Sequence, residues 1–117
     1  MDDLTITRLC AEAMGWQHKT IAILDGRKKI GDTFYVLRDI SPKGEWHPYD
    51  PLHDDAQAMA LVKKCSLSII AGEKPGGGLT GNWGIIPPGV LSPKHWQPDL
   101  NRAICECVSR MMKAKNG

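Results

Sequence analysis

Long hydrophobic runs are missing from this sequence, because no apolar stretch approaches the ~20 residues that a membrane-spanning helix requires. Its first residues, Met1-Asp-Asp-Leu-Thr5, are acidic. A secretory signal would instead show a basic segment followed by an apolar run. We therefore expect a cytoplasmic protein that contacts no membrane.

Paired cysteine motifs are also absent. The four cysteines are Cys10, Cys65, Cys105 and Cys107, and none has Cys-x-x-Cys spacing. They stand within apolar patterns, which is typical of buried, reduced thiols. Cys105 and Cys107 would point to nearly opposite sides of a helix, so they cannot readily share a metal ion. We expect no metal and no cofactor.

A strong excess of one charge is absent as well. The 15 Lys/Arg and 13 Asp/Glu residues give a net charge of +2 and a pI near 8.4, whereas a nucleic-acid-binding domain usually concentrates more positive charge. Residues 51–117 carry eight basic and five acidic residues, a weak tilt toward acidic partners. The 117 residues, 42% apolar and 24% charged, fit one globular domain over 1–117.

Three segments have the spacing of amphipathic helices. Residues 3–14 place apolar side chains at helical intervals, with Asp2 or Asp3 as the N-cap and Gly15 as the stop. Asp50 and Pro51 predict the start of a second helix that runs to about residue 64. The third, from residue 100, shows an unbroken apolar stripe typical of a helix laid on a sheet.

Strand signals lie between these helices. Residues 20–24 and 33–37 flank an Asp-Gly turn and predict a hairpin, with a polar run at 27–29 that we interpret as a solvated loop. Residues 66–71 and 82–86 predict a second antiparallel pair. The glycine-rich segment 72–81 lacks the Gly-Lys-[Ser/Thr] ending of a phosphate-binding loop, so we interpret it as a mobile hairpin tip. Together these elements predict an α+β fold, with three helices packed on a small, mainly antiparallel sheet.

The succession of elements resembles a known family. In order, the chain shows Met14-Gly-Trp16, Pro48-Tyr-Asp-Pro-Leu-His-Asp-Asp-Ala56, a short strand with Trp83, and Asp99-Leu-Asn-Arg-Ala-Ile-Cys105. This order is similar to that of small phage and prophage proteins of the phage ABA sandwich type, with residues about 17–44 and 72–81 as variable insertions. The resemblance implies an α/β/α-type sandwich and a phage or prophage origin. It implies no established activity and transfers no catalytic residues.

One cluster invites a catalytic interpretation. His47, Asp50, His53 and Asp54 are residue types that bind divalent metals in hydrolases. However, the aspartates already have roles in helix capping, and the spacing of the two histidines matches no standard ligand pattern. A small metal-dependent hydrolase that uses His47, Asp50 and His53 therefore remains the alternative function.

The favoured hypothesis is a non-catalytic binding module for a host or phage macromolecule. The candidate contact residues, which lie in or beside irregular segments, are Trp46, His47, Tyr49, His53 and Trp96. Trp83 is better explained as a cap on the sheet. Nucleic acid is weakly supported, because only Lys43 and Lys94 stand close to these aromatic residues. A homodimer formed through an edge strand at 66–71 also remains open.

Overall fold

The computed structural model describes residues 1–37 and 44–116. In this part of the chain a helix is followed twice by three strands and a further helix. The elements are α1 (Asp3–Ala13), β1 (Gln17–Asp25), β2 (Lys28–Leu37), β3 (Trp46–Pro48), α2 (Asp55–Cys65), β4 (Ser68–Glu73), β5 (Leu79–Ile86), β6 (Trp96–Gln97) and α3 (Leu100–Asn116). The predicted α+β class with three helices is confirmed.

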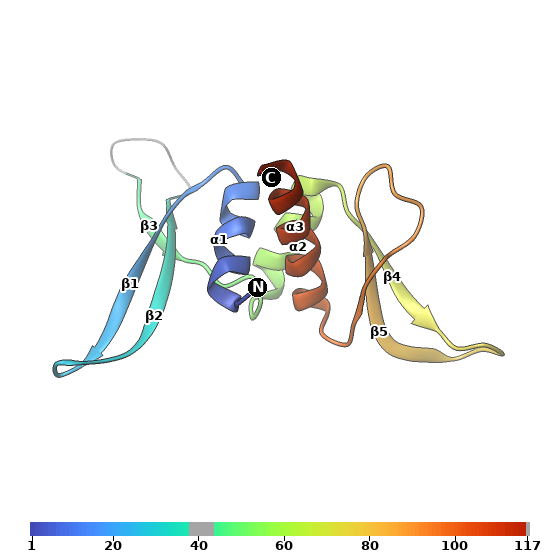
Figure 1. Ribbon diagram of the computed structural model, residues 1–117, viewed down its shortest axis with the longest axis horizontal. Coiled ribbons are helices and arrows are strands. Elements are labelled where there is room, and N and C mark those ends of the chain that lie inside the picture. Colours follow the sequence, from blue (N-terminus) through green and yellow to red (C-terminus); the bar gives the residue numbers. More distant parts are fainter. Residues whose placement is uncertain (38–43, 117) are drawn as a thin grey trace.

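The strands form two sheets instead of the single predicted sheet. One sheet has the order β1-β2-β3 and the other β4-β5-β6, and all neighbouring strands are antiparallel. The three helices lie between the sheets, so that a sheet closes each end of the molecule (Figure 1). The helices are therefore the middle layer, because each sheet has helices against only one of its faces.

The molecule is elongated. Its principal extents are 56 × 32 × 27 Å, and its radius of gyration is 16.2 Å. A compact domain of this length would have a radius of about 13 Å. The difference comes from the two hairpins, β1–β2 and β4–β5, whose tips extend past the helices into solvent (Figure 1).

Helix α1 begins and ends as its sequence predicts. The Asp2 side chain accepts a hydrogen bond from a first-turn backbone N–H at 2.8 Å and so caps the helix. After the last turn Gly15 takes a φ of +78°, which favours glycine. The Trp16 N–H then donates to the Ala11 carbonyl at 3.2 Å, the closing bond of a Schellman motif. Trp16 is thereby folded back against the core.

Helix α2 begins later than predicted, because Asp54 and not Asp50 is its N-cap. Asp54 accepts a hydrogen bond from the Gln57 N–H at 2.9 Å. The Gln57 side chain reaches back to the backbone of the preceding turn, accepting from the Asp50 N–H at 2.7 Å and donating to the Pro48 carbonyl at 3.1 Å. These bonds hold Asp50 and Pro51 in a turn outside the helix, so the prediction of an Asp50 cap was wrong.

Both predicted strand pairs are present, and both hairpins extend further than predicted. The first turns at Gly26, whose φ is +64°, and β2 already begins at Lys28, so the polar run at 27–29 is largely strand rather than loop. In the second, β4 ends at Glu73 and β5 begins at Leu79. The glycine-rich turn is therefore shorter than the predicted tip.

Helix α3 is the centre of the core. Its buried residues are Ala103, Ile104, Cys105, Cys107, Val108 and Ser109. Its largest contact is with α1 rather than with a sheet, and it also packs on α2 and β5. Arg102 donates to Asp3 of α1 at 2.9 Å, and Asn101 donates to Asp55 of α2 at 2.8 Å. These contacts fix the three helices that carry the two sheets.

Candidate functional site

The structure brings together four of the five predicted contact residues. Trp46 and His47 lie in β3, Tyr49 directly follows it, and His53 lies in the turn before α2. Trp96 lies in β6, in the sheet at the opposite end of the molecule (Figure 1). Four of the predicted residues therefore lie close together along the chain beside the first sheet, although their side chains point to different places, and the fifth lies on the second sheet.

Trp46 contributes to the face of the first sheet that points away from the helices. It stands opposite Leu37 of β2, and the Lys19 ammonium lies 4.2 Å from its ring centroid. A cation held over an indole face in this way contributes about 0.5–1 kcal/mol at an exposed site. Lys43, predicted to stand near Trp46, lies outside the described residues.

Tyr49 belongs to the core. Only 3% of its surface is exposed, and its ring makes an edge contact with Trp16 at a centroid distance of 5.6 Å. It also lies 6.5 Å from the Phe34 ring. Tyr49 therefore fixes the start of the α2 segment against the first sheet, and the partly exposed residues around it form the surface.

The two histidines of the cluster border one shallow hollow. His47, Asp50, His53, Asp54 and Gln57 line it together with a proline, around a volume of about 420 Å³. The His53 Nδ1 lies 2.9 Å from an Asp50 carboxylate oxygen, and 73% of the His53 side chain is exposed. Nowhere in the described ranges do three His, Cys, Asp or Glu side chains gather in a way that could hold a metal ion.

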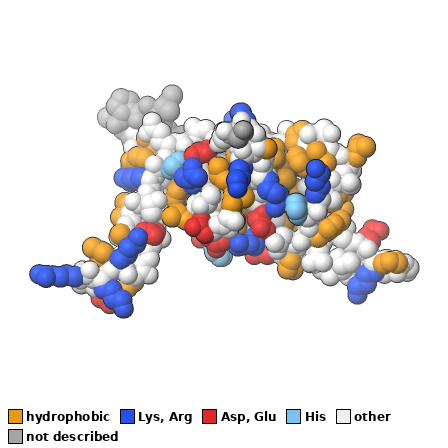
Figure 2. Space-filling model, viewed as in Figure 1, with side chains coloured by type: hydrophobic (Ala, Val, Ile, Leu, Met, Phe, Trp, Pro, Cys, Tyr) orange, Lys and Arg blue, Asp and Glu red, His pale blue; other side chains and the backbone are white. Residues whose placement is uncertain are grey.

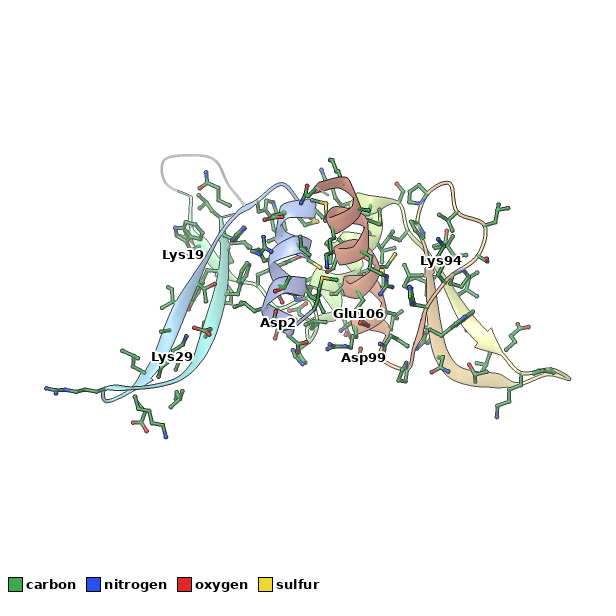
Figure 3. All side chains as sticks on the ribbon, in the orientation of Figure 1. Asp2, Lys19, Lys29, Lys94, Asp99 and Glu106 are labelled. Atoms are coloured by element: carbon green, nitrogen blue, oxygen red, sulfur yellow. The ribbon has the colours of Figure 1, made fainter. Side chains whose placement is uncertain are left out.

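The sequence reasoning missed an exposed apolar surface on the β1–β2 hairpin. Ile21, Ile23, Leu24 and Ile30 are each between 44% and 61% exposed. Basic side chains lie among them, as Figure 2 shows along the arm at the left, and Lys19 and Lys29 are marked in Figure 3. The alternation of apolar residues around the Asp-Gly turn could have indicated this surface. The sequence alone did not show that the helices leave these apolar side chains uncovered.

Part of the outer face of the second sheet is covered by its own chain, although Ile70 on the same face remains 40% exposed. A methyl group on Gly84 would lie 2.6 Å from Pro93 Cγ and 3.0 Å from Trp96 Cζ3. One on Gly72 would lie 3.3 Å from the same Trp96 atom. The Trp96 indole therefore lies across two glycines, while Trp83 packs against the core as predicted.

A cavity of about 370 Å³ lies between this second sheet and α3. Its lining residues are Ile85, Pro87, Val90, Ser92, Lys94, His95, Cys107, Arg110 and Met111. The sequence reasoning missed it as a site, because Arg110 falls on the polar side of the predicted helical stripe and Lys94 and His95 lie in an irregular segment. Only the fold brings the three together.

The cysteines are not in disulfides. All four lie in the described residues and are free; Cys10, Cys105 and Cys107 are buried, and Cys65 is half-buried. Burial raises the pKa of the Cys107 thiol and that of the Cys65 thiol. Both are therefore neutral at pH 7, and a neutral thiol is a poor nucleophile.

None of the described helices combines the length and the apolar character needed to cross a membrane. No protein-family model, no curated protein and no solved structure matches the chain. The resemblance to phage ABA sandwich proteins therefore stays a prediction, and the geometry of the two sheets is the basis for any proposed function.

Proposed function

We propose that this protein is a non-catalytic binding module, and that an extended acidic segment of a partner protein adds to the free edge of β1. The observation that carries the proposal is the solvent exposure of β1. Apart from His18, every residue from Gln17 to Asp25 is exposed, although the strand contains three isoleucine or leucine residues. Because the sequence resembles phage ABA sandwich proteins, we expect the partner to be a host or phage protein.

The edge of β1 is suited to pairing with another strand. β1 is the first strand of its sheet, so one of its edges faces no other described strand. Residues 20–24 contain neither charge nor proline, the devices that usually protect an edge. The register shift between Ile23 and Leu24 places the extra residue, Ile30, in β2. β1 itself therefore stays regular, and its main chain can pair with an added strand.

The edge of the second sheet is less suitable. β4 is shorter, with six residues against nine in β1. Its pairing with β5 is interrupted between Ala71 and Glu73, where two extra residues lie in β5. The regularly paired part of β4 is therefore only Ser68–Ala71. We therefore place the contact on β1 rather than at residues 66–71.

The charge of the first hairpin favours an acidic partner. Between residues 17 and 33 the basic residues are Lys19, Arg27, Lys28 and Lys29, and the acidic ones are Asp25 and Asp32. The hairpin therefore carries a net charge of +2. Lys29 lies 3.0 Å from Asp32, and none of the other three cations forms an ion pair with an acidic side chain in the described part of the chain. Steering by such charges mainly increases the rate of association.

The test is a peptide selection with matched variants. A random peptide library is selected on the purified protein, and we expect enrichment of extended acidic peptides that protect the backbone amides of residues 20–24 from hydrogen exchange. Ile23→Asp should weaken binding at least tenfold, because aspartate is disfavoured in strands and its charge repels an acidic segment. Ile70→Asp is the control, since Ile70 is similarly exposed (40% against 44%) and also stands opposite a glycine on the other sheet.

Three results would contradict the proposal. Equal loss of affinity in the two variants would show that β1 has no special role. A concentration-dependent dimer that Ile23→Asp abolishes would assign the edge to a second copy of the chain. Salt-dependent binding of a DNA or RNA duplex that Ile23→Asp leaves unchanged, together with no peptide binding, would move the function to nucleic acid.

A further inference from the structure

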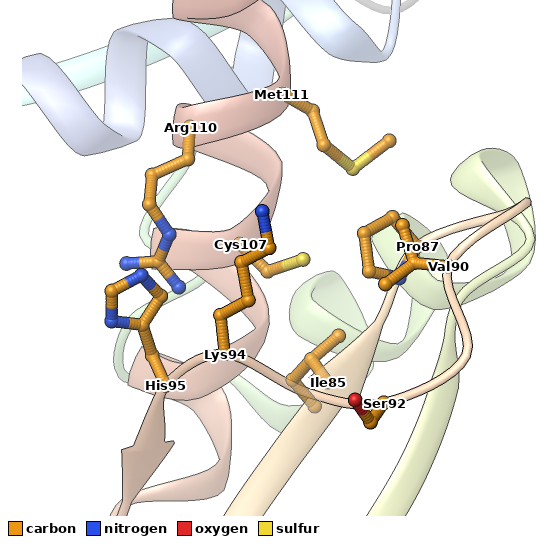
Figure 4. A pocket seen from close by; sticks show the side chains of 9 residues that line it. All are labelled: Ile85, Pro87, Val90, Ser92, Lys94, His95, Cys107, Arg110 and Met111. Carbon is orange, nitrogen blue, oxygen red and sulfur yellow. The ribbon is translucent and has the colours of Figure 1, made fainter.

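The cavity beside the second sheet has two chemically different sides. Ile85 of β5, Pro87 and Val90 of the following loop, and Cys107 and Met111 of α3 supply apolar walls. Lys94, His95 and Arg110 gather at the other side (Figure 4). The volume of about 370 Å³ is at the lower end of the range of about 300–1,000 Å³ that is typical of small-molecule sites.

The basic side chains of the cavity have no ion-pair partner among the described residues. Those that line the cavity include neither Asp nor Glu. Within residues 1–37 and 44–116, no ion pair joins Lys94, His95 or Arg110 to an acidic side chain. Arg102, about two turns earlier on the same helix, is by contrast paired with Asp3 at 2.9 Å. Unneutralised cations that gather around an apolar cavity repel one another, and a bound anion would relieve this repulsion.

We propose that this cavity binds a small organic oxyanion, a carboxylate or a phosphate on a compact apolar body. The planar guanidinium of Arg110 matches two oxygens of such a group, and Lys94 adds a compact positive charge. The apolar body lies against Pro87, Val90 and Met111. The neutral Cys107 thiol fits this wall as a small apolar group.

This site is independent of the proposed function. The cavity lies at the second sheet, and the β1 edge lies at the opposite end of the molecule (Figure 1). A failure of the anion site would therefore leave the peptide site untouched. A failure of the peptide site would likewise leave the anion site untouched, so each experiment tests one site only.

The test compares three ligands of similar size with nuclear magnetic resonance and calorimetry. 1-Naphthoate and 1-naphthyl phosphate carry an oxyanion, and 1-naphthalenemethanol is the uncharged control. We expect both anions to shift the resonances of Ile85, Val90 and Met111, and to bind at least tenfold more tightly than the alcohol. Added salt should weaken the anions and leave the alcohol unchanged. The ratio between the two anions distinguishes carboxylate from phosphate.

Arg110→Met is the principal variant, because methionine keeps much of the side-chain length and is a good helix former. We expect it to weaken both anions at least tenfold. Lys115→Met is the matched control, since Lys115 lies on the same helix, is exposed and lies outside the cavity. Val90→Asp, at a partly exposed loop position, should also weaken the anions by placing a negative charge beside them.

Two results would overturn the anion site. One is equal affinity for the anions and the alcohol in the native protein. The other is an Arg110→Met affinity that matches the Lys115→Met affinity while the thermal unfolding curve is unchanged. If Arg110→Met unfolds the protein, Val90→Asp decides, and unchanged anion affinity in that folded variant overturns the proposal.

Discussion

The two halves of the molecule repeat one local plan with different outcomes. In each half a hairpin is followed by a short third strand that begins with tryptophan, and a proline then leads toward a helix: Trp46-His-Pro48 precedes α2, and Trp96-Gln-Pro98 precedes α3. Each edge strand places an exposed isoleucine opposite a glycine, Ile23 opposite Gly31 and Ile70 opposite Gly84. The likeness therefore extends to single positions of the sheets.

The difference lies in what covers the outer faces. Over Gly84 the segment that contains Pro93 and Trp96 fills the space, so that a methyl group on this glycine would lie 2.6 Å from the proline and 3.0 Å from the indole. Over Gly31 the nearest such atom is Ile23 Cδ1, at 3.9 Å. The outer face of the second sheet is thus partly covered by its own loop and the sheet forms a cavity against α3, whereas the first keeps an open outer face and a longer edge strand. The same strand pattern therefore supports two kinds of binding surface.

The largest expected effect tests whether the two arms depend on one shared core. Ile104 of α3 is fully buried, and Ile23 of β1 is 44% exposed. Ile104→Ala should lower the free energy of unfolding by about 2–5 kcal/mol, and Ile23→Ala by less than about 0.5 kcal/mol. Urea unfolding followed by circular dichroism measures both. Similar losses in the two variants would show that the β1–β2 hairpin is part of the cooperative core.

A second prediction tests the closed and open faces directly. Gly84→Ala should destabilise the protein by about 1–3 kcal/mol, because its methyl group would collide with Pro93 and Trp96. Gly31→Ala should stabilise it by about 0.5–1 kcal/mol, because alanine has less backbone freedom in the unfolded chain. Thermal unfolding of both variants provides the measurement. If Gly84→Ala left the stability unchanged, the loop would move away easily from Gly84, and the outer faces of the two sheets would be equally open.

The smallest effect is expected at the histidine hollow. The His53 and Asp50 side chains are 73% and 58% exposed, and exposed ion pairs contribute about 0–1 kcal/mol. His53→Ala should therefore change the unfolding free energy by less than about 0.5 kcal/mol and leave peptide and anion binding unchanged. A metal-dependent hydrolytic activity that this variant abolishes would instead favour the alternative function.

Local sequence signals determined much of the architecture. Asp2 and Gly15 define the two ends of α1, the unbroken apolar stripe defines α3, and the strand pairs follow from β-rich runs around Gly26 and around the glycine-rich turn. Each of these signals depends on bonds or packing within a short stretch of chain, so the sequence alone shows them.

The folded structure decided what the local sequence patterns left open. Two aspartates, Asp50 and Asp54, both fit the pattern of an N-cap, and the long side chain of Gln57 selected the second by bonding to the turn before the helix. The placement of α2 between the hairpins divided the strands into two sheets. Arg110 likewise lines the same cavity as Lys94 only because α3 packs against the second sheet. The local sequence patterns are compatible with one sheet or with two, and only the packing of the three helices selects the arrangement with two.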